Sequence, residues 1–370
     1  MSTLFSIVIP CYNQAHFLPD CLESLIRQSY QNWEALLIND GSSDNTRQVA
    51  ESYVAKDSRI KLFEKKNGGL SSARNYALPH VTGNLIQFLD SDDWILPNCL
   101  ETIATNVEDR IDLIVSGYGY CKEQSKKIIH THKPNDPKIA LIDLIVKQNL
   151  GPCHSIFIKS DIIRKVGVFD QELKSCEDWD FWIRAIKVGA NIKFIPDILV
   201  IYRYVENSMS RNPKVMYESL LLVNERATKK DDRLVGNYPL NIDYQTNLST
   251  LFKFHLINCL GVSLMQGNVE SLIKWFLEEK KKWNWDIELS DFCKMNSYLS
   301  FKYFSERQEI NFVLKEIKPN FITFFSGLGY TKKEIIIANK YVFESQLKKN
   351  NHFKYGKFIG AFLNKLKFYE

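Results

Sequence analysis

The strongest constraint on the fold is the alternation of short apolar runs with helical patterns over the first 120 residues. This alternation is typical of βαβ units, in which the strands lie parallel in one sheet and helices cover it. We therefore expect an α/β domain with a mostly parallel, Rossmann-like central sheet. The expected strands cover residues 5–10, 34–38, 60–63, 85–89 and 112–115, and the expected helices begin near Leu18, Asp44, Ser71 and Pro97.

The pattern changes twice further along the chain. Residues 120–150 are rich in lysine and predict a polar excursion, after which strands at 155–158 and 199–204 and helices at 160–166 and 178–188 resume the α/β pattern. Beyond Arg211, long helical patterns follow one another. A chain of 370 residues exceeds the usual size of one core. We therefore expect an α/β domain over residues 1–211 and a mainly helical domain over 212–370.

Charge and cysteine content exclude several classes. Residues 1–210 carry 23 basic and 26 acidic side chains, so the excess that makes the net charge +5 lies in the second half. A nucleic-acid-binding domain needs a concentrated basic surface, and we expect no nucleic-acid partner. The eight cysteines form no metal or redox motif. Without a leader or a long apolar run, the chain is expected to be cytoplasmic.

Polar residues follow the first two expected strands. Tyr12 and Asn13 come after the strand that stops at Pro10, and Asp40 ends the next strand. Ligands of open α/β sheets bind beyond these strand ends, so the ring can stack on a base and Asp40 can accept from a base or ribose. The alternatives are that Tyr12 closes the sheet edge and that Asp44 caps the following helix.

A Gly-Gly turn precedes the third helix. Gly69 would let the backbone approach a ligand, and Arg74 could reach an anionic or base group. The alternatives are that the Gly-Gly segment is only a turn before a helix and that Arg74 is a surface residue, neither of which needs a ligand.

Two acidic segments carry the sharpest signals. Residues 90–93 read Asp-Ser-Asp-Asp directly after a buried-type strand, where repulsion between carboxylates is tolerated best around a cation such as Mg²⁺ or Mn²⁺. Residues 177–180 read Glu-Asp-Trp-Asp, where nearby aromatic rings can raise a carboxylate pKa toward that of a general base. A solvated turn and an acidic first turn of a helix are the alternatives.

Together these motifs resemble the inverting family 2 glycosyltransferases of the GT-A fold over residues 4–211. The motifs are S-I-V-I-P-C-Y-N, N-D-G-S-S-D-N-T, G-G-L-S-S-A-R-N, L-D-S-D-D and C-E-D-W-D-F-W-I-R. The resemblance implies a nucleotide-sugar donor, favouring UDP-hexose or UDP-N-acetylhexosamine, a divalent metal and a glycan or lipid-linked acceptor of surface polysaccharide synthesis.

The resemblance also assigns roles to single residues. It implies that Asp90 and Asp92 hold Mn²⁺ or Mg²⁺ and that Asp178 is the catalytic base. The residues expected on the nucleotide side are Pro10, Tyr12, Asn13, Asp40, Gly69, Arg74 and Ser91. Those expected on the acceptor or leaving-group side are His154, Glu177, Trp179 and Arg203.

Two departures from the family pattern affect these roles. Where many relatives have Y-R-x-H, this chain has Val205 in the histidine position, so Arg203 is expected to compensate or the metal site to be weaker. The Q-x-x-R-W block of processive members is absent, which favours transfer of a single sugar.

The last 25 residues, 346–370, hold six lysines and one acidic residue. As a helix they would align apolar residues on one face, typical either of an interfacial helix on an anionic membrane or of a helix packed on the protein. A peripheral location on the inner face of the cell membrane follows from the first reading.

Two other functions share part of this pattern. A sugar-phosphate nucleotidyltransferase would need a Gly-rich phosphate loop after the first strand, where this chain has Pro-Cys-Tyr-Asn. A non-catalytic scaffold of a polysaccharide assembly complex would not need the retained Asp92 and Asp178.

Overall fold

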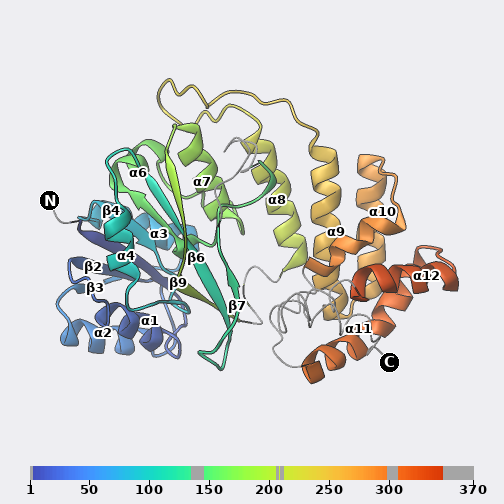
Figure 1. Ribbon diagram of the computed structural model, residues 1–370, viewed down its shortest axis with the longest axis horizontal. Helices are drawn as coiled ribbons and strands as arrows, with labels where there is room; N and C mark the ends of the chain where they lie inside the picture. The colour runs from blue at the N-terminus through green and yellow to red at the C-terminus, as the bar shows by residue number, and fades with distance from the viewer. Residues whose placement is uncertain (1–2, 135–145, 206–207, 209–211, 298–306, 345–370) are drawn as a thin grey trace. The chain divides into compact units, whose positions relative to one another are not determined.

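The computed structural model describes residues 3–134, 146–205, 208, 212–297 and 307–344 (Figure 1). Contacts divide the chain into two units, one formed by residues 1–205 with 222–246 and the other by residues 206–221 with 247–370. The boundary expected near residue 211 falls outside the described residues and stays a prediction. Residues 222–246, expected in the helical domain, cluster with the α/β unit.

The first unit is built on one sheet, in which the described residues form nine strands. The order is β3-β2-β1-β4-β8-β6-β9-β5, with β7 beside β6. The strands are β1 (Phe5–Cys11), β2 (Trp33–Asn39), β3 (Ile60–Glu64), β4 (Leu85–Phe88), β5 (Trp94–Ile95), β6 (Leu113–Lys122), β7 (Ile128–His132), β8 (Ile156–Lys159) and β9 (Ile192–Tyr204).

The expected α/β sheet is confirmed, and its parallel part lies where the βαβ pattern is clearest. Strands β3, β2, β1 and β4 are parallel neighbours, whereas β8 runs antiparallel between β4 and β6. β1 and β2 are buried along their whole lengths, as expected of continuous apolar strands covered on both faces. The sheet as a whole is therefore mixed.

Helices and short helical turns connect the strands of the first unit. They are α1 (Leu18–Ile26), α2 (Thr46–Lys56), α3 (Leu70–Ala77), the 3₁₀ turn η1 (Leu78–His80), α4 (Cys99–Asn106), the 3₁₀ turn η2 (Cys153–Ser155), α6 (Ser160–Val166) and α7 (Glu177–Lys187). The lysine-rich segment differs from expectation, because β6 continues to Lys122 and pairs with β7. β7 is largely exposed, so the sequence showed no apolar alternation there.

The mainly helical character expected after residue 211 is confirmed. The elements are α8 (Pro213–Ala227), α9 (Leu248–Gln266), α10 (Val269–Trp283), the 3₁₀ segment η4 (Leu289–Ser297), α11 (Arg307–Gly327), α12 (Lys332–Asn339) and the π-helical turn η6 (Lys340–Glu344). The second unit has its own buried cluster, in which Phe292 and Phe324 are fully buried. Within the described residues, no helix combines the length and apolarity that a membrane crossing requires. The basic segment 346–370 lies outside them.

Candidate functional site

The predicted site residues gather where parallel strands end. Cys11 at the end of β1 is in register with Asn39 at the end of β2, and Val8 pairs with Phe88 at the end of β4. The loops that follow these strands therefore leave the sheet at one edge, which is where an open α/β sheet binds its ligands.

The loop after β1 is fixed by its asparagine. Asn13 adopts a positive φ of 54°, and its Oδ1 accepts from the Ser43 backbone N–H at 2.8 Å. Its own N–H donates to Ser42 Oγ at 3.0 Å. The Asn13 amide, expected to face a ligand, thus joins two loops, while the ring of Tyr12 is 49% exposed beside it. Pro10 lies buried within β1 and precedes both residues.

Asp40 and Gly69, both predicted on the nucleotide side, are in direct contact. The buried Asp40 carboxylate accepts from the backbone N–H groups of Gly68 at 3.0 Å and Gly69 at 2.8 Å, and it forms an ion pair with Lys65. Gly69 has a φ of 87°, which favours glycine, and α3 begins directly after it. Asp40 therefore shapes the loop before α3 whether or not a nucleotide is bound.

Arg74 is buried between two carboxylates. Its side chain is 1% exposed, with Nη1 2.7 Å from Glu177 Oε1 and Nη2 2.7 Å from Asp90 Oδ1. The predicted nucleotide contact of Arg74 stays a prediction. In the structure, α3 directs the guanidinium inward, where it joins the acidic loop after β4 to the start of α7. Glu177, expected on the acceptor side, is likewise buried in this pair.

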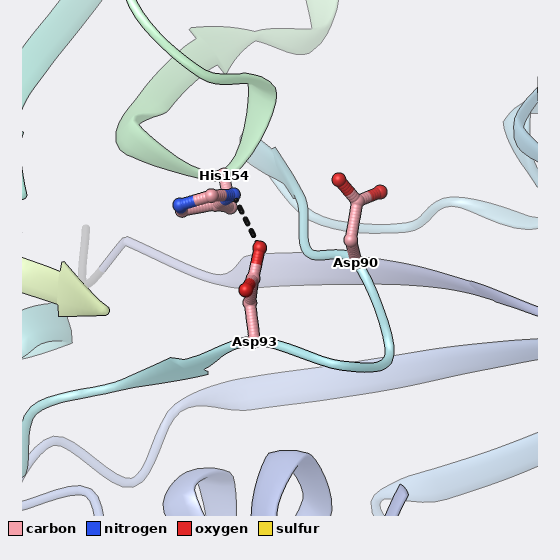
Figure 2. Close-up of side chains that lie close together, drawn as sticks. All are labelled: Asp90, Asp93 and His154. Atoms are coloured by element: carbon pink, nitrogen blue, oxygen red, sulfur yellow. Dashed lines mark ion pairs between the residues drawn. The ribbon is translucent and has the colours of Figure 1, made fainter. Parts of the chain in front are cut away.

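The acidic loop contains a residue that we did not select from the sequence. Asp93 is buried, and its Oδ1 accepts from the Arg203 backbone N–H at 2.6 Å. Its Oδ2 lies 2.9 Å from Nδ1 of the fully buried His154 (Figure 2). Ser91 is also buried. The signal for Asp93 in the sequence was its place as the third carboxylate of the Asp-Ser-Asp-Asp run.

Two overlapping sets of side chains in and around this loop offer ligand atoms for a cation. One is the predicted pair, Asp90 and Asp92, and the other is Asp90 with Asp93 and His154. Ligand atoms of Asp90, Asp93 and His154 all lie within 4.8 Å of one another, and His154 Nε2 is buried without a hydrogen-bond partner in the described structure. Asp92 is outside this group. Burial and the nearby charges of Asp93 and Asp90 raise the pKa of Asp92 well above its usual range, as crowding of carboxylates without a cation requires. Carboxylate oxygens suit Mg²⁺ and Mn²⁺.

Arg203 supports the acidic loop from β9. Its Nε donates to the Asp92 carbonyl at 2.8 Å, Nη1 to the Glu123 carbonyl at 2.9 Å, and Nη2 to Asp20 Oδ2 at 2.7 Å. The guanidinium also lies 4.8 Å from the centre of the Trp94 ring. All three nitrogens of the guanidinium thus have partners within the chain, and the predicted role of Arg203 on the leaving-group side stays a prediction.

Asp178 has the environment of a general base. Burial raises its pKa to about 7, and the charge of Glu177 adds to the rise, while Arg74 and a hydrogen bond from Asn149 oppose it. Asn149 Nδ2 donates to Asp178 Oδ2 at 3.1 Å. Trp179 follows Asp178 in α7 and is itself buried. A carboxylate with a pKa near neutrality is suited to accept a proton from a hydroxyl group.

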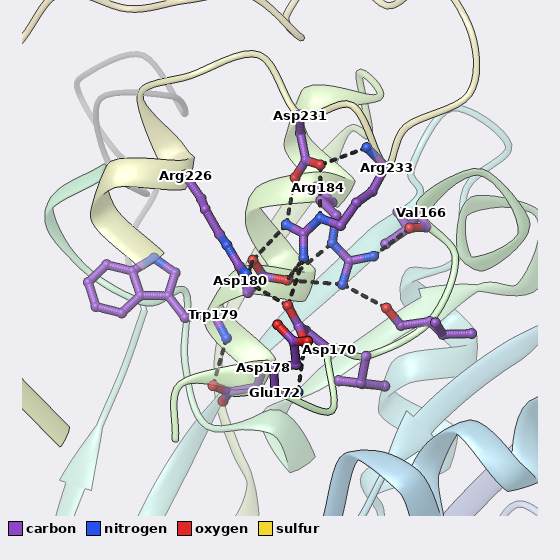
Figure 3. A network of polar contacts seen from close by, with 12 residues as sticks. Val166, Asp170, Glu172, Asp178, Trp179, Asp180, Arg184, Arg226, Asp231 and Arg233 are labelled. Atoms are coloured by element: carbon purple, nitrogen blue, oxygen red, sulfur yellow. Dashed lines mark hydrogen bonds and ion pairs between the residues drawn. The ribbon is translucent and has the colours of Figure 1, made fainter. Parts of the chain in front are cut away.

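Behind Asp178, α7 is held by a cluster of charges around Asp180 (Figure 3). Asp180 is 1% exposed and accepts from Arg184 Nη2 at 3.1 Å and from Arg233 Nη2 at 2.8 Å. Arg226 Nη1 lies 3.3 Å from Asp180 and 2.7 Å from Asp170. The sequence did not reveal this cluster, since Arg226 and Arg233 are about fifty residues away from α7.

Comparisons with known proteins give a family match for part of the chain. A family profile described as "Glycosyl transferase family 2" matches residues 6–166. The uncharacterized glycosyltransferase EpsJ of Bacillus subtilis is 29% identical over 224 residues, which are 58% of this chain and 64% of that protein. The uncharacterized glycosyltransferase RT0329 of Rickettsia typhi is 32% identical over 54% of this chain and 63% of its own. The chain thus spans less than two thirds of the length of either relative.

Solved structures share the fold. S. aureus TarS 1-349 in complex with UDP-GlcNAc aligns with a TM-score of 0.54 and 18% identity, covering 89% of this chain and 93% of that one. The complex of the same protein with UDP aligns with a TM-score of 0.52 and 19% identity over the same shares. The expected GT-A fold is thereby confirmed. Residues 6–166 therefore match the domain of glycosyl transferase family 2, the family that the sequence motifs resemble.

Proposed function

We propose that the protein transfers a single sugar from a nucleotide sugar to a hydroxyl group of a glycan or lipid-linked acceptor, with inversion at the anomeric carbon. The observation that carries the proposal is the placement of Asp178. It has a pKa raised to about 7 and lies next to Glu177, which Arg74 connects to the acidic loop that holds Asp90. One buried arginine thus fixes the proposed base relative to the carboxylates of the donor site.

The proposed reaction is a direct displacement. Asp178 takes the proton of the acceptor hydroxyl while the oxygen of that hydroxyl bonds to the anomeric carbon, and the bond from this carbon to the nucleoside diphosphate breaks on the opposite face. One base suffices, so the anomeric configuration of the product is inverted. Tyr12, near Asp40, is the proposed contact for the base of the nucleotide.

A divalent cation belongs to this proposal, with Asp90 and Asp92 as its protein ligands. Asp93 has both oxygens engaged, with the Arg203 N–H and with His154, and it is less exposed than Asp90. A bound cation would stabilise negative charge on the departing diphosphate. Mg²⁺ and Mn²⁺ commonly use one or two carboxylates and complete their shell with substrate phosphate oxygens.

UDP-GlcNAc is the first donor to test, because a TarS structure of the same fold contains it. We expect release of UDP from UDP-GlcNAc with Mn²⁺ present and a rate loss of about 10²- to 10⁴-fold in Asp178→Asn, with nucleotide binding retained. Asp161→Asn, which changes an exposed carboxylate of α6, serves as the control. Full activity of Asp178→Asn would remove the assignment of the base.

If UDP-GlcNAc gives no product, a panel of nucleotide sugars distinguishes a wrong donor from a wrong function. Release of a nucleoside diphosphate from any of them supports sugar transfer. Release of pyrophosphate from a nucleoside triphosphate and a sugar phosphate would instead indicate a nucleotidyltransferase. Binding without turnover of any donor would favour a scaffold.

A further inference from the structure

The contact partner of Asp178 from outside α7 is an asparagine that no motif contains. Asn149 Nδ2 donates to Asp178 Oδ2 at 3.1 Å. On its other side, Asn149 Oδ1 is buried and has no hydrogen-bond partner among the described residues. A buried acceptor without a partner costs free energy, and such groups in folded proteins call for an explanation. Here the amide group is satisfied only where it faces the proposed base.

This contact has a chemical direction. An ionised carboxylate accepts hydrogen bonds and donates none, so the amide must face Asp178 with its N–H₂ group rather than its oxygen. A donor in this position stabilises the charged form of the carboxylate and leaves less stabilisation for the protonated form. Asn149 therefore favours the form of Asp178 that can take a proton.

A second asparagine holds the loop that carries Asn149. Asn224 of α8 is fully buried, and its Nδ2 donates to the Val146 carbonyl at 2.7 Å. Two residues further along α8, Arg226 reaches Asp180 in the helix that carries Asp178. One stretch of α8 thus fixes both the residue that donates and the helix of the residue that accepts.

We propose that Asn149, held in place by Asn224, is a positioning residue that orients Asp178 and keeps it in its ionised form. The inference rests on the proposed function, because it needs Asp178 to act as the base. It adds a residue from the segment 146–150 and a support from α8, neither of which belongs to the motifs of the catalytic domain.

The other charged groups around Asp178 determine what a change at position 149 does. Glu177 raises the pKa of Asp178, Arg74 from α3 lowers it, and the thiol of Cys153 lies within electrostatic range. A base works above its pKa, so activity should rise with pH and level off above about 7. Without the Asn149 hydrogen bond this rise should move to higher pH.

The test is the pH dependence of UDP release from UDP-GlcNAc with Mn²⁺ in the full chain. We expect Asn149→Ala to move the apparent pKa of the rising limb upward by about one unit, the equivalent of one hydrogen bond to a charged group. The isosteric Asn149→Asp places a second carboxylate beside Asp178 and should move it further. Asn224→Ala should give a smaller shift in the same direction.

Asn106→Ala is the matched control. The Asn106 side chain in α4 donates to a backbone carbonyl, as that of Asn224 does, but it lies outside the site. It should leave the apparent pKa unchanged. A lower rate of Asn149→Ala at every pH with an unmoved limb would show a purely structural role and overturn the inference. Absence of nucleoside diphosphate release from the unmodified protein with every donor would instead count against the proposed function.

Discussion

At the scale of single residues, Arg74 and Arg203 show how the acidic loop tolerates its charge. Arg74 pairs with Asp90 from one side. From the other side, Arg203 donates through Nε to the Asp92 carbonyl and through its backbone N–H to Asp93 Oδ1. Each arginine is at most 6% exposed. Because buried guanidinium groups need partners, the loop and the two arginines stabilise one another. Burial and the neighbouring carboxylates still raise the pKa of Asp92 well above its usual range, and Asp92 is where we place the cation.

This placement of the cation predicts different effects for substitutions of two neighbouring carboxylates, Asp92 and Asp93. We expect Asp92→Asn to weaken the Mn²⁺-dependent part of UDP binding by at least about tenfold, because it removes a ligand oxygen charge. Asp93→Asn should retain most of it, since an amide oxygen can still accept from the Arg203 N–H. Calorimetry with and without Mn²⁺ measures both. The opposite result would move the site to Asp90, Asp93 and His154.

The sequence predicted the residues of this site better than their contacts. Asp40, Asp90 and Asp178 follow strands or begin a helix, so their approximate places could be predicted from local patterns. Whether Arg74 faces solvent or the interior depends on a partner about a hundred residues away, Glu177. Asn149 belongs to no motif and could be found only once the fold brought it to Asp178.

At the scale of elements, α7 carries both the proposed base, Asp178, and its anchor, Asp180, in its first turn. Asp180 is surrounded by Arg184, Arg226 and Arg233 and is 1% exposed. Further support comes from Lys187, whose Nζ donates to the Arg226 carbonyl at 2.9 Å. Buried charges therefore hold the side of the helix that faces residues 222–246, in addition to its buried apolar side chains.

Asp180→Ala should destabilise the first unit strongly. The change leaves Arg184, which is 2% exposed, without its carboxylate, and breaking a buried pair in this way costs about 3–5 kcal/mol. Urea unfolding followed by tryptophan fluorescence measures the loss. Asp161→Ala, which removes an exposed partner of Arg164 on α6, should change stability little. A loss as small in Asp180→Ala would mean that the cluster does not hold α7.

Elements with a strong apolar pattern could be predicted, and those without one could not. β1 and β2 are fully buried, and the sequence indicated them within one or two residues. β5 has two residues and β7 is exposed, so their pairing depends on β9 and β6 rather than on their own composition. The antiparallel β8 was found as a strand, but its direction depends on the loop that precedes it.

At the scale of the whole molecule, the surplus of positive charge lies in the second half of the chain. Residues 346–370 account for a balance of +5 and lie outside the described structure. We propose that this segment binds an anionic membrane surface and so brings the enzyme to a lipid-linked acceptor. Nothing in the described residues offers a membrane-spanning helix for the same purpose.

Deletion of residues 346–370 should release the protein from vesicles that contain phosphatidylglycerol. Replacement of Lys354, Lys357 and Lys365 by glutamine should weaken binding by roughly 100-fold, at about 1 kcal/mol for each lysine. Cosedimentation with anionic and with neutral vesicles measures the effect. Equal binding of the deleted and the full chain would favour a helix packed on the protein instead.

Residues 222–246 belong to the α/β unit, and this affects where the chain can be joined to that of a relative in a chimera. The family motifs end before residue 211, which makes that point the obvious junction for a chimera. A junction there would take Asn224, Arg226 and Arg233 from the other parent and leave Asp180 facing unrelated side chains. Exchange of C-terminal parts should therefore place the junction after Thr246, so that α7 keeps the anchors with which it evolved.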